Sequence, residues 1–182
     1  MGGRAKLNIL KRMSGMALVG LSLSACQTMT PYEAASPLGH ITVAFADAAW
    51  TGKDVPKDGI CKRNGGNGNA PMLALSDVPD GTNAVIVKFS DRSYQPNNNG
   101  GHGTIGYWVT PSQGSVTLPS VPETTTTGLP EGTWKEGKVY AGPCSGGRGN
   151  IYEADVYAVH KDKTNEKLSR TLATGLIRLG RF

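Results

Sequence analysis

Short stretches in which apolar and polar residues alternate recur along the chain, separated by clusters of glycine, proline and asparagine. Residues 151–160 place Tyr152, Ala154, Val156 and Ala158 on one side, against acidic residues on the other. Residues 40–47 and 104–110 repeat this period of two, whereas residues 83–90 form a nearly continuous apolar run. These patterns predict strands of a mainly β, mostly antiparallel protein, in which residues 83–90 are covered on both faces.

Residues 164–177 have a different pattern. Leu168, Leu172 and Leu176 recur at every fourth position, Thr164 can cap the start, and Glu166 follows in the first turn. This spacing predicts an amphipathic helix whose leucines pack on the sheets as part of the core.

The first 25 residues have the pattern of an export leader. Four basic residues and no acidic ones precede an apolar stretch that is too short for a helix to cross a bilayer, which takes about 20 residues. The stretch ends in Leu23-Ser24-Ala25-Cys26, which resembles the lipobox of bacterial lipoproteins. We therefore expect residues 1–25 to be removed and Cys26 to carry the lipid; an ordinary secretory peptide with an incidental cysteine is the alternative.

Anchoring through Cys26 predicts a location in the cell envelope. Gln27 follows the lipidated position where an aspartate would signal retention, which predicts the periplasmic face of the outer membrane in a Gram-negative source. The membrane is then a partner of the chain through the lipid.

Removal of the leader also changes the charge balance. The whole chain has 19 Lys and Arg against 14 Asp and Glu, but four of the bases lie in the leader, so the mature chain has 15 against 14. The composition then gives no support for a nucleic-acid partner, which needs a clustered basic face. We expect no cofactor and no bound metal.

The mature chain, residues 26–182, is long enough for one domain with a hydrophobic core and short for two. Residues 26–39 contain two prolines and little periodicity, so they are predicted to form a flexible tether. Residues 40–182 are predicted to form the single folded domain.

Two cysteines remain once Cys26 is acylated. Cys61 and Cys144 would then lie in an oxidising compartment, where a disulfide is the default expectation. Two separate thiols are the alternative, because the sequence does not establish that their Cα atoms approach within roughly 7 Å.

Four separated segments resemble, in the same order, the phosphatidylethanolamine-binding protein (PEBP) family, in particular its bacterial Raf-kinase-inhibitor-like members. They are Cys61 with residues 68–82 (GNAPML and DVPDGT), residues 85–93 ending in FSDRS, residues 102–111 (HGTIGYWVTP), and residues 140–144 (YAGPC) with 152–159 (YEADVYAV). The resemblance covers roughly residues 60–160. It implies an antiparallel β-sandwich, on which the predicted C-terminal helix would pack.

The chain departs from the family's pattern at several of these positions. Arg92 and Ser93 replace the proline and second acid of an Asp-Pro-Asp turn, and Asn150 stands where a second histidine is expected. His102 lies about two residues earlier than the family's histidine, which keeps its face of the strand but moves the ring by about 6 to 7 Å.

The resemblance also implies a site at which a small anion, such as phosphate or a phospholipid headgroup, enters a surface cavity. The residues that would surround it are Asp91, His102, Gly142, Pro143, Asn150 and Tyr152. Backbone N–H groups of a glycine-rich loop can face an anion, and a histidine, an amide and a phenol can donate hydrogen bonds to its oxygens. Asp91 would repel an anion unless it orients His102 or takes an ammonium group, and a zwitterionic headgroup satisfies both demands.

Each of these residues also has a purely structural interpretation. Asp91 can start a turn, His102 between glycines can be a solvated loop residue, and Tyr152 on an apolar strand face can belong to the core.

Three hypotheses for function follow. The leading one is a non-catalytic envelope lipoprotein that binds a small anionic or headgroup-like ligand, or a protein partner, through this site. The second is an enzyme with Cys144 as nucleophile and His102 as base, which a disulfide would abolish. The third is a structural or inhibitory envelope protein that acts on a protein partner.

Overall fold

The computed structural model describes residue 2, residues 38–125 and residues 127–182. Apart from residue 2, the predicted leader, the predicted lipidation site Cys26 and most of the predicted tether lie outside the described residues. Within the described part, no helix is long and apolar enough to span a membrane.

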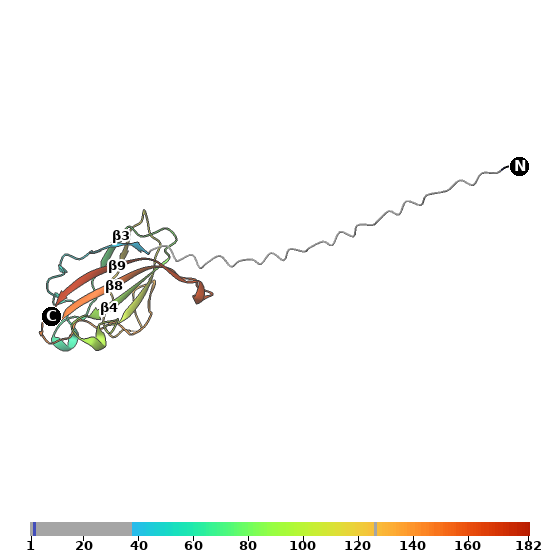
Figure 1. The fold of residues 1–182 in the computed structure, drawn as a ribbon. Coiled ribbons are helices and arrows are strands. Elements are labelled where there is room, and N and C mark those ends of the chain that lie inside the picture. The colour runs from blue at the N-terminus through green and yellow to red at the C-terminus, as the bar shows by residue number, and fades with distance from the viewer. Residues whose placement is uncertain (1, 3–37, 126) are drawn as a thin grey trace. The chain divides into compact units, whose positions relative to one another are not determined.

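The larger of two sheets has six strands in the order β1-β9-β8-β4-β5-β7. Its strands are β1 (Gly39–His40), β4 (Ala84–Asp91), β5 (Thr104–Trp108), β7 (Thr133–Lys135), β8 (Ile151–His160) and β9 (Arg170–Arg181). All neighbouring strands pair antiparallel except β1 and β9, which are parallel. The long β8–β9 hairpin runs through the body and its connection projects from it (Figure 1).

The smaller sheet has three antiparallel strands in the order β2-β3-β6. Its strands are β2 (Thr42–Phe45), β3 (Leu73–Ser76) and β6 (Val116–Leu118). Leu73, Leu75 and Leu118 from this sheet join Val87 and Phe89 of β4 in one buried hydrophobic cluster. The two sheets therefore share a core, as a β-sandwich does.

The strand predictions are confirmed where the alternation was clearest. In β8 the residues Tyr152, Ala154, Val156 and Ala158 are buried, while the three residues between them are half-exposed. In β5, Tyr107 is buried and Trp108 faces outward. Residues 83–90 form most of β4, which lies between β5 and β8 at the centre of the larger sheet.

The predicted helix at 164–177 is wrong. A single 3₁₀ turn, η3 (Glu166–Leu168), is capped by the Asn165 side chain and not by Thr164, and β9 begins at Arg170. A spacing of four is also a multiple of two, so leucines at every fourth position fit one face of a strand equally well. In β9 that face is the outer one: Leu168 before it is 59% exposed and Leu176 is 54% exposed, whereas Ala173 and Leu179 are buried.

The other two 3₁₀ turns, η1 (Lys62–Asn64) and η2 (Gln95–Asn97), are in loops that follow Cys61 and β4. They lie at the end of the body where β4 and β9 end and β8 begins (Figure 1). The same end carries the residues described next.

Candidate functional site

Asp91 is the last residue of β4 and lies opposite Tyr152 in the register of β4 and β8. Its carboxylate is buried, with 3% of the residue exposed. One oxygen, Oδ2, accepts a hydrogen bond from Asn150 Nδ2 at 2.7 Å, and Oδ1 accepts one from the Ser93 backbone N–H at 2.9 Å. Asp91 does start a turn, and it also accepts a hydrogen bond from the side-chain amide of Asn150.

His102 lies just before β5 and is buried, so the interpretation as a solvated loop residue is wrong. Its Nδ1 lies 2.9 Å from the carbonyl oxygen of Ala141, which can only accept, so Nδ1 carries the hydrogen. The other ring nitrogen, Nε2, makes no hydrogen bond within residues 38–125 and 127–182. Because Tyr140 Oη is the one fully enclosed side-chain polar atom without a partner in that part, Nε2 of His102 reaches solvent.

Tyr152 connects these groups. Its ring is buried and meets the His102 ring edge-on, with 5.2 Å between the centroids. Its hydroxyl oxygen accepts a hydrogen bond from the Cys144 backbone N–H at 3.2 Å. Burial raises the pKa of Tyr152, and the nearby Asp91 carboxylate adds to this rise, so the phenol keeps its proton at neutral pH. Tyr152 is thus both a core residue and a polar contact of the cluster.

The loop that carries Gly142 and Pro143 is fixed by a disulfide. Cys61 and Cys144 are bonded with their Cα atoms 5.3 Å apart, which confirms the expected pairing. The Cys61 N–H also donates to the Pro143 carbonyl at 3.0 Å. Gly142 packs so closely here that a Cβ would lie 2.7 Å from the carbonyl oxygen of Gly59, which leaves no room for a side chain.

A buried acid that the sequence did not single out, Glu123, lies behind this loop. It is 6% exposed, and its two oxygens accept from the Lys62 N–H at 2.8 Å and the Gly142 N–H at 3.2 Å. Gly68 makes room for this acid, because a Cβ at that position would lie 2.4 Å from Cδ of Glu123. Glu123 therefore joins the loops on both sides of the disulfide.

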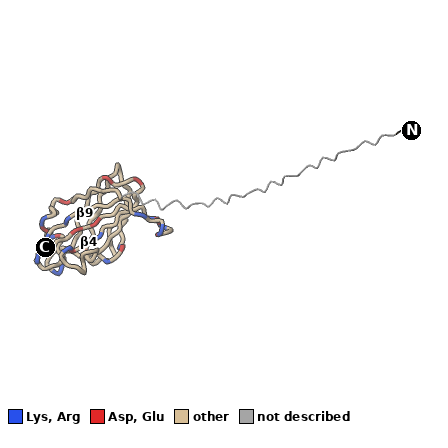
Figure 2. The backbone as a smooth tube through the Cα atoms, viewed as in Figure 1, with Lys and Arg blue, Asp and Glu red and all other residues tan. Residues whose placement is uncertain are grey.

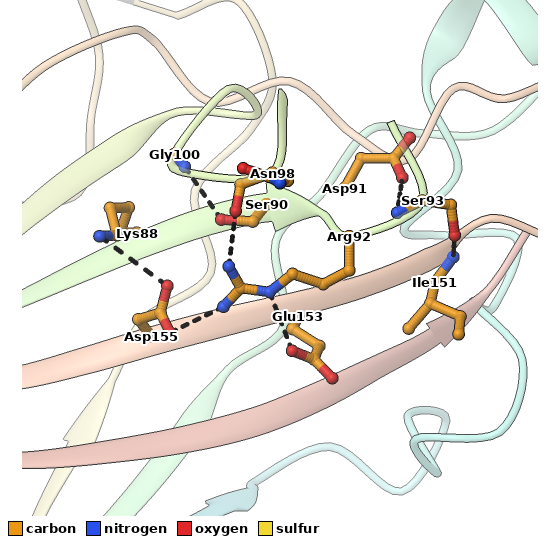
Figure 3. Close-up of polar contacts among 10 residues, drawn as sticks. All are labelled: Lys88, Ser90, Asp91, Arg92, Ser93, Asn98, Gly100, Ile151, Glu153 and Asp155. Atoms are coloured by element: carbon orange, nitrogen blue, oxygen red, sulfur yellow. Dashed lines mark hydrogen bonds and ion pairs between the residues drawn. The ribbon is translucent and has the colours of Figure 1, made fainter. Parts of the chain in front are cut away.

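Arg92 turns away from this cluster. Its guanidinium binds Glu153 at 2.9 Å and Asp155 at 2.8 Å on the outer face of β8, and donates to the Asn98 carbonyl at 2.6 Å. Ser93 binds the Ile151 N–H through its hydroxyl at 2.9 Å. Figure 3 shows both residues joining the β4 turn to β8, with Arg92 directed away from Asp91.

The structure thus brings together all six residues named from the resemblance, through direct contacts or shared loops. However, few hydrogen-bond donors among these residues and their loops remain free to bind an anion. The Gly142 N–H is taken by Glu123, the Cys144 N–H by Tyr152 and the Ala141 N–H by the His102 carbonyl. This corrects the expectation that these glycine-loop N–H groups face a ligand.

The remaining groups are Nε2 of His102, which accepts in the neutral ring and donates only in the protonated one, and the second hydrogen of the Asn150 amide. Surface grooves of about 260 to 540 Å³ lie elsewhere on the body. Within the described residues, no group of three His, Cys, Asp or Glu side chains is placed to hold a metal ion.

Two solved structures are similar to this chain over most of their length. One is Escherichia coli YbcL, described as a member of the mammalian PEBP family, with 20% sequence identity and a TM-score of 0.57; the match covers 79% of this chain and 98% of YbcL. The other is CT736 of Chlamydia trachomatis, described as a candidate PEBP homologue, with 17% identity, a TM-score of 0.50 and coverage of 79% and 97%. The chain matches no protein-family model and no curated protein sequence.

These structures show that the chain has the fold of the phosphatidylethanolamine-binding proteins. The fold is a mainly β sandwich, as the resemblance implied, but with one parallel strand pair and without the expected C-terminal helix.

Proposed function

We propose that this chain is a non-catalytic envelope lipoprotein that binds a small phosphate-bearing ligand, such as a phospholipid headgroup, at the cluster around His102. The binding residues are Asp91, His102, Gly142, Pro143, Asn150 and Tyr152. The observation that carries the proposal is the burial of His102 with one ring nitrogen bound to Ala141 and the other left free towards solvent.

Nε2 of the neutral ring is an acceptor, so it suits a ligand that supplies a proton, either on a phosphate oxygen or on an ammonium group. In the neutral ring Nε2 accepts, and it can receive a hydrogen bond from a phosphate monoanion; in the protonated ring it donates. Asp91 lies close by through Asn150 and Tyr152, and offsets a positive charge on the histidine or on the ligand. A zwitterionic headgroup such as phosphoethanolamine supplies both charges.

A thermal-shift and NMR titration with phosphate, phosphoethanolamine and a short-chain phosphatidylethanolamine tests the binding. We expect a response to phosphoethanolamine that His102→Gln removes and Asp91→Asn weakens. A flat response of the folded wild-type protein to all three ligands would overturn the proposal.

His160 offers a matched control. It lies at the other end of β8 from Tyr152, and its Nδ1 makes the same kind of contact, 3.0 Å from the Gly81 carbonyl. His160→Gln therefore removes an equivalent ring and hydrogen bond without touching the cluster. Equal loss of binding in both variants would also refute the site.

Anchoring is the second part of the proposal. We propose that Cys26 carries the lipid and that the chain is held at the periplasmic face of the outer membrane, with no nucleic-acid partner. Metabolic labelling with a clickable fatty acid should label the wild type and not Cys26→Ser. Labelling of both, or of neither, would refute the anchor.

The competing enzyme hypothesis requires a free Cys144 thiol, and in this structure Cys144 is bonded to Cys61. A disulfide sulfur is not the thiolate that a cysteine nucleophile needs. Binding of an envelope protein through the same face remains the alternative use of the site, and a pull-down from solubilised envelopes with wild type and His102→Gln distinguishes it.

A further inference from the structure

Two tryptophans lie side by side on the outer face of the larger sheet, away from the cluster described above. Trp108 ends β5 and Trp134 lies in the neighbouring edge strand β7, with 4.8 Å between their ring centroids. The Trp134 ring lies across Gly106, where a Cβ would come within 2.1 Å of it. Glycine at this position therefore allows the indole to lie flat on the sheet, and Trp108 beside it is 37% exposed.

Polar contacts hold this pair in place. The Trp134 indole N–H donates to Glu136, which also binds Lys161 at 3.2 Å. The Lys161 backbone is fixed in turn by the Asn83 side chain, through bonds of 2.7 and 3.0 Å. The aromatic surface is thus preformed and does not depend on a ligand for its arrangement.

Two grooves lie beside this pair, one lined by Trp108 and the other by Glu136, which binds the Trp134 indole. One, of about 540 Å³, is lined by Trp108, Lys161, Lys163, Glu166 and neighbours in the β8–β9 connection. The other, of about 260 Å³, shares Lys161 and Glu166 with it and continues along the sheet past Ile86. Together they form a longer groove, which we call the indole groove.

The charges along the indole groove balance. Its basic residues are Lys161, Lys163 and Arg170, and its acidic residues are Glu136, Asp162 and Glu166. A polyanion would meet as many carboxylates as ammonium groups, and a purely apolar partner would leave these charges desolvated without partners. The groove instead offers aromatic surface together with donors and acceptors in similar number.

From this combination we infer that the indole groove binds a neutral oligosaccharide. Sugar rings present apolar C–H faces, which pack on indole rings, and hydroxyl groups, which both donate and accept hydrogen bonds. Lys163 now lies over the Trp108 ring, with Nζ 4.6 Å from its centroid. A sugar ring replaces that ammonium group, and the flexible lysine stem lets it move to a hydroxyl of the ligand.

The chain contains three tryptophans, and the third one, Trp50, serves as an internal control. Trp50 is buried in the core, with 3% exposed, and stacks on Phe45 instead of on the other two indoles. In the ¹⁵N-labelled mature protein, the indole N–H signals of Trp108 and Trp134 should shift on titration with chitotetraose, cellotetraose or maltotetraose, while that of Trp50 stays unchanged. We expect a dissociation constant in the millimolar range or below, so titration to about 10 mM is sufficient.

Variants separate this site from the phosphate site. Trp108→Leu should abolish the glycan shifts, whereas His102→Gln should leave them unchanged, because His102 lies before the start of β5 and Trp108 at its end, about 20 Å apart along an extended chain. The inference is overturned if none of the three glycans moves the Trp108 and Trp134 signals. It is also overturned if inorganic polyphosphate moves them and the glycans do not, because the groove would then serve a polyanion.

Discussion

The side-chain amide of Asn150 donates a hydrogen bond to the buried carboxylate of Asp91 over 2.7 Å. An amide can donate without carrying a charge, so this pair leaves Asp91 free to balance a positive charge elsewhere, on His102 or on a ligand. A histidine at the same position would become positively charged at low pH.

Replacement of Asn150 by aspartate should convert this bond into a repulsion. Two carboxylates at this distance cannot both be ionised at no cost, so Asn150→Asp should lower the free energy of unfolding by about 1–3 kcal/mol at pH 7. The pair's pKa is then raised in the folded state, so stability returns as the pH falls and one carboxyl takes up a proton. Urea denaturation at pH 7 and pH 5 measures both effects; Asn165→Asp, at an exposed turn, is the control and should show neither.

The ion pairs of Arg92 should matter for stability and not for ligand binding. Arg92 binds two acids of β8, but its side chain is 30% exposed, so solvent screens the pairs. Arg92→Ala should lower the free energy of unfolding by about 1 kcal/mol, less at high salt, and should leave the phosphoethanolamine response unchanged. A loss of ligand response in a folded Arg92→Ala protein would place Arg92 in the site after all.

The sequence predicts this site better than it predicts the elements around it. The strands that carry or flank Asp91, His102 and Tyr152 follow from the sequence, β5 and β8 from a period of two and β4 from its apolar run, and the resemblance supplies their order. The sequence does not reveal the role of Glu123, because that role depends on two loop N–H groups that only the folded chain brings within hydrogen-bonding distance. The helix error at β9 has a similar origin: pairing with β8 over ten register positions outweighs a local leucine spacing that fits both structures.

The disulfide should stabilise both the fold and the candidate site. It closes a span of 83 residues and joins the Cys61 loop to the loop of Gly142 and Pro143. The double variant Cys61→Ser with Cys144→Ser should lower the free energy of unfolding by about 2–4 kcal/mol. Its affinity for phosphoethanolamine should fall under conditions where it is still folded, as judged by circular dichroism. Wild-type affinity in the folded double variant would show that the loop holds its shape without the bond.

The enclosed hydroxyl of Tyr140 predicts a stabilising substitution. This residue is 1% exposed, and its hydroxyl has no hydrogen-bond partner in the described part of the chain. Tyr140→Phe removes a polar group that was desolvated without compensation, so it should raise the free energy of unfolding by roughly 1 kcal/mol at neutral pH. Denaturant unfolding measures the change, and an equal or lower stability would indicate that the hydroxyl is bonded in solution.

The buried tyrosines also predict a loss of stability in alkali. Burial raises the pKa of Tyr107 and of Tyr140 in the folded protein. In the unfolded chain tyrosines titrate near 10, so above about pH 10 the unfolded state holds fewer protons than the folded state, and stability falls as the pH rises. The fall should be shallower in Tyr140→Phe than in wild type. Identical slopes would mean that Tyr140 does not resist ionisation in the folded state.

The outward face of β9 gives a direct check on the strand that replaced the predicted helix. Leu176 is 54% exposed and lies in a strand, so Leu176→Gln should change the free energy of unfolding by less than about 0.5 kcal/mol. Leu179, three residues on, is 1% exposed and points into the core, so Leu179→Ala should cost about 2–4 kcal/mol. A helix with its leucine stripe in the core requires Leu176→Gln to be the more damaging change, so denaturant unfolding of the two variants separates the two arrangements.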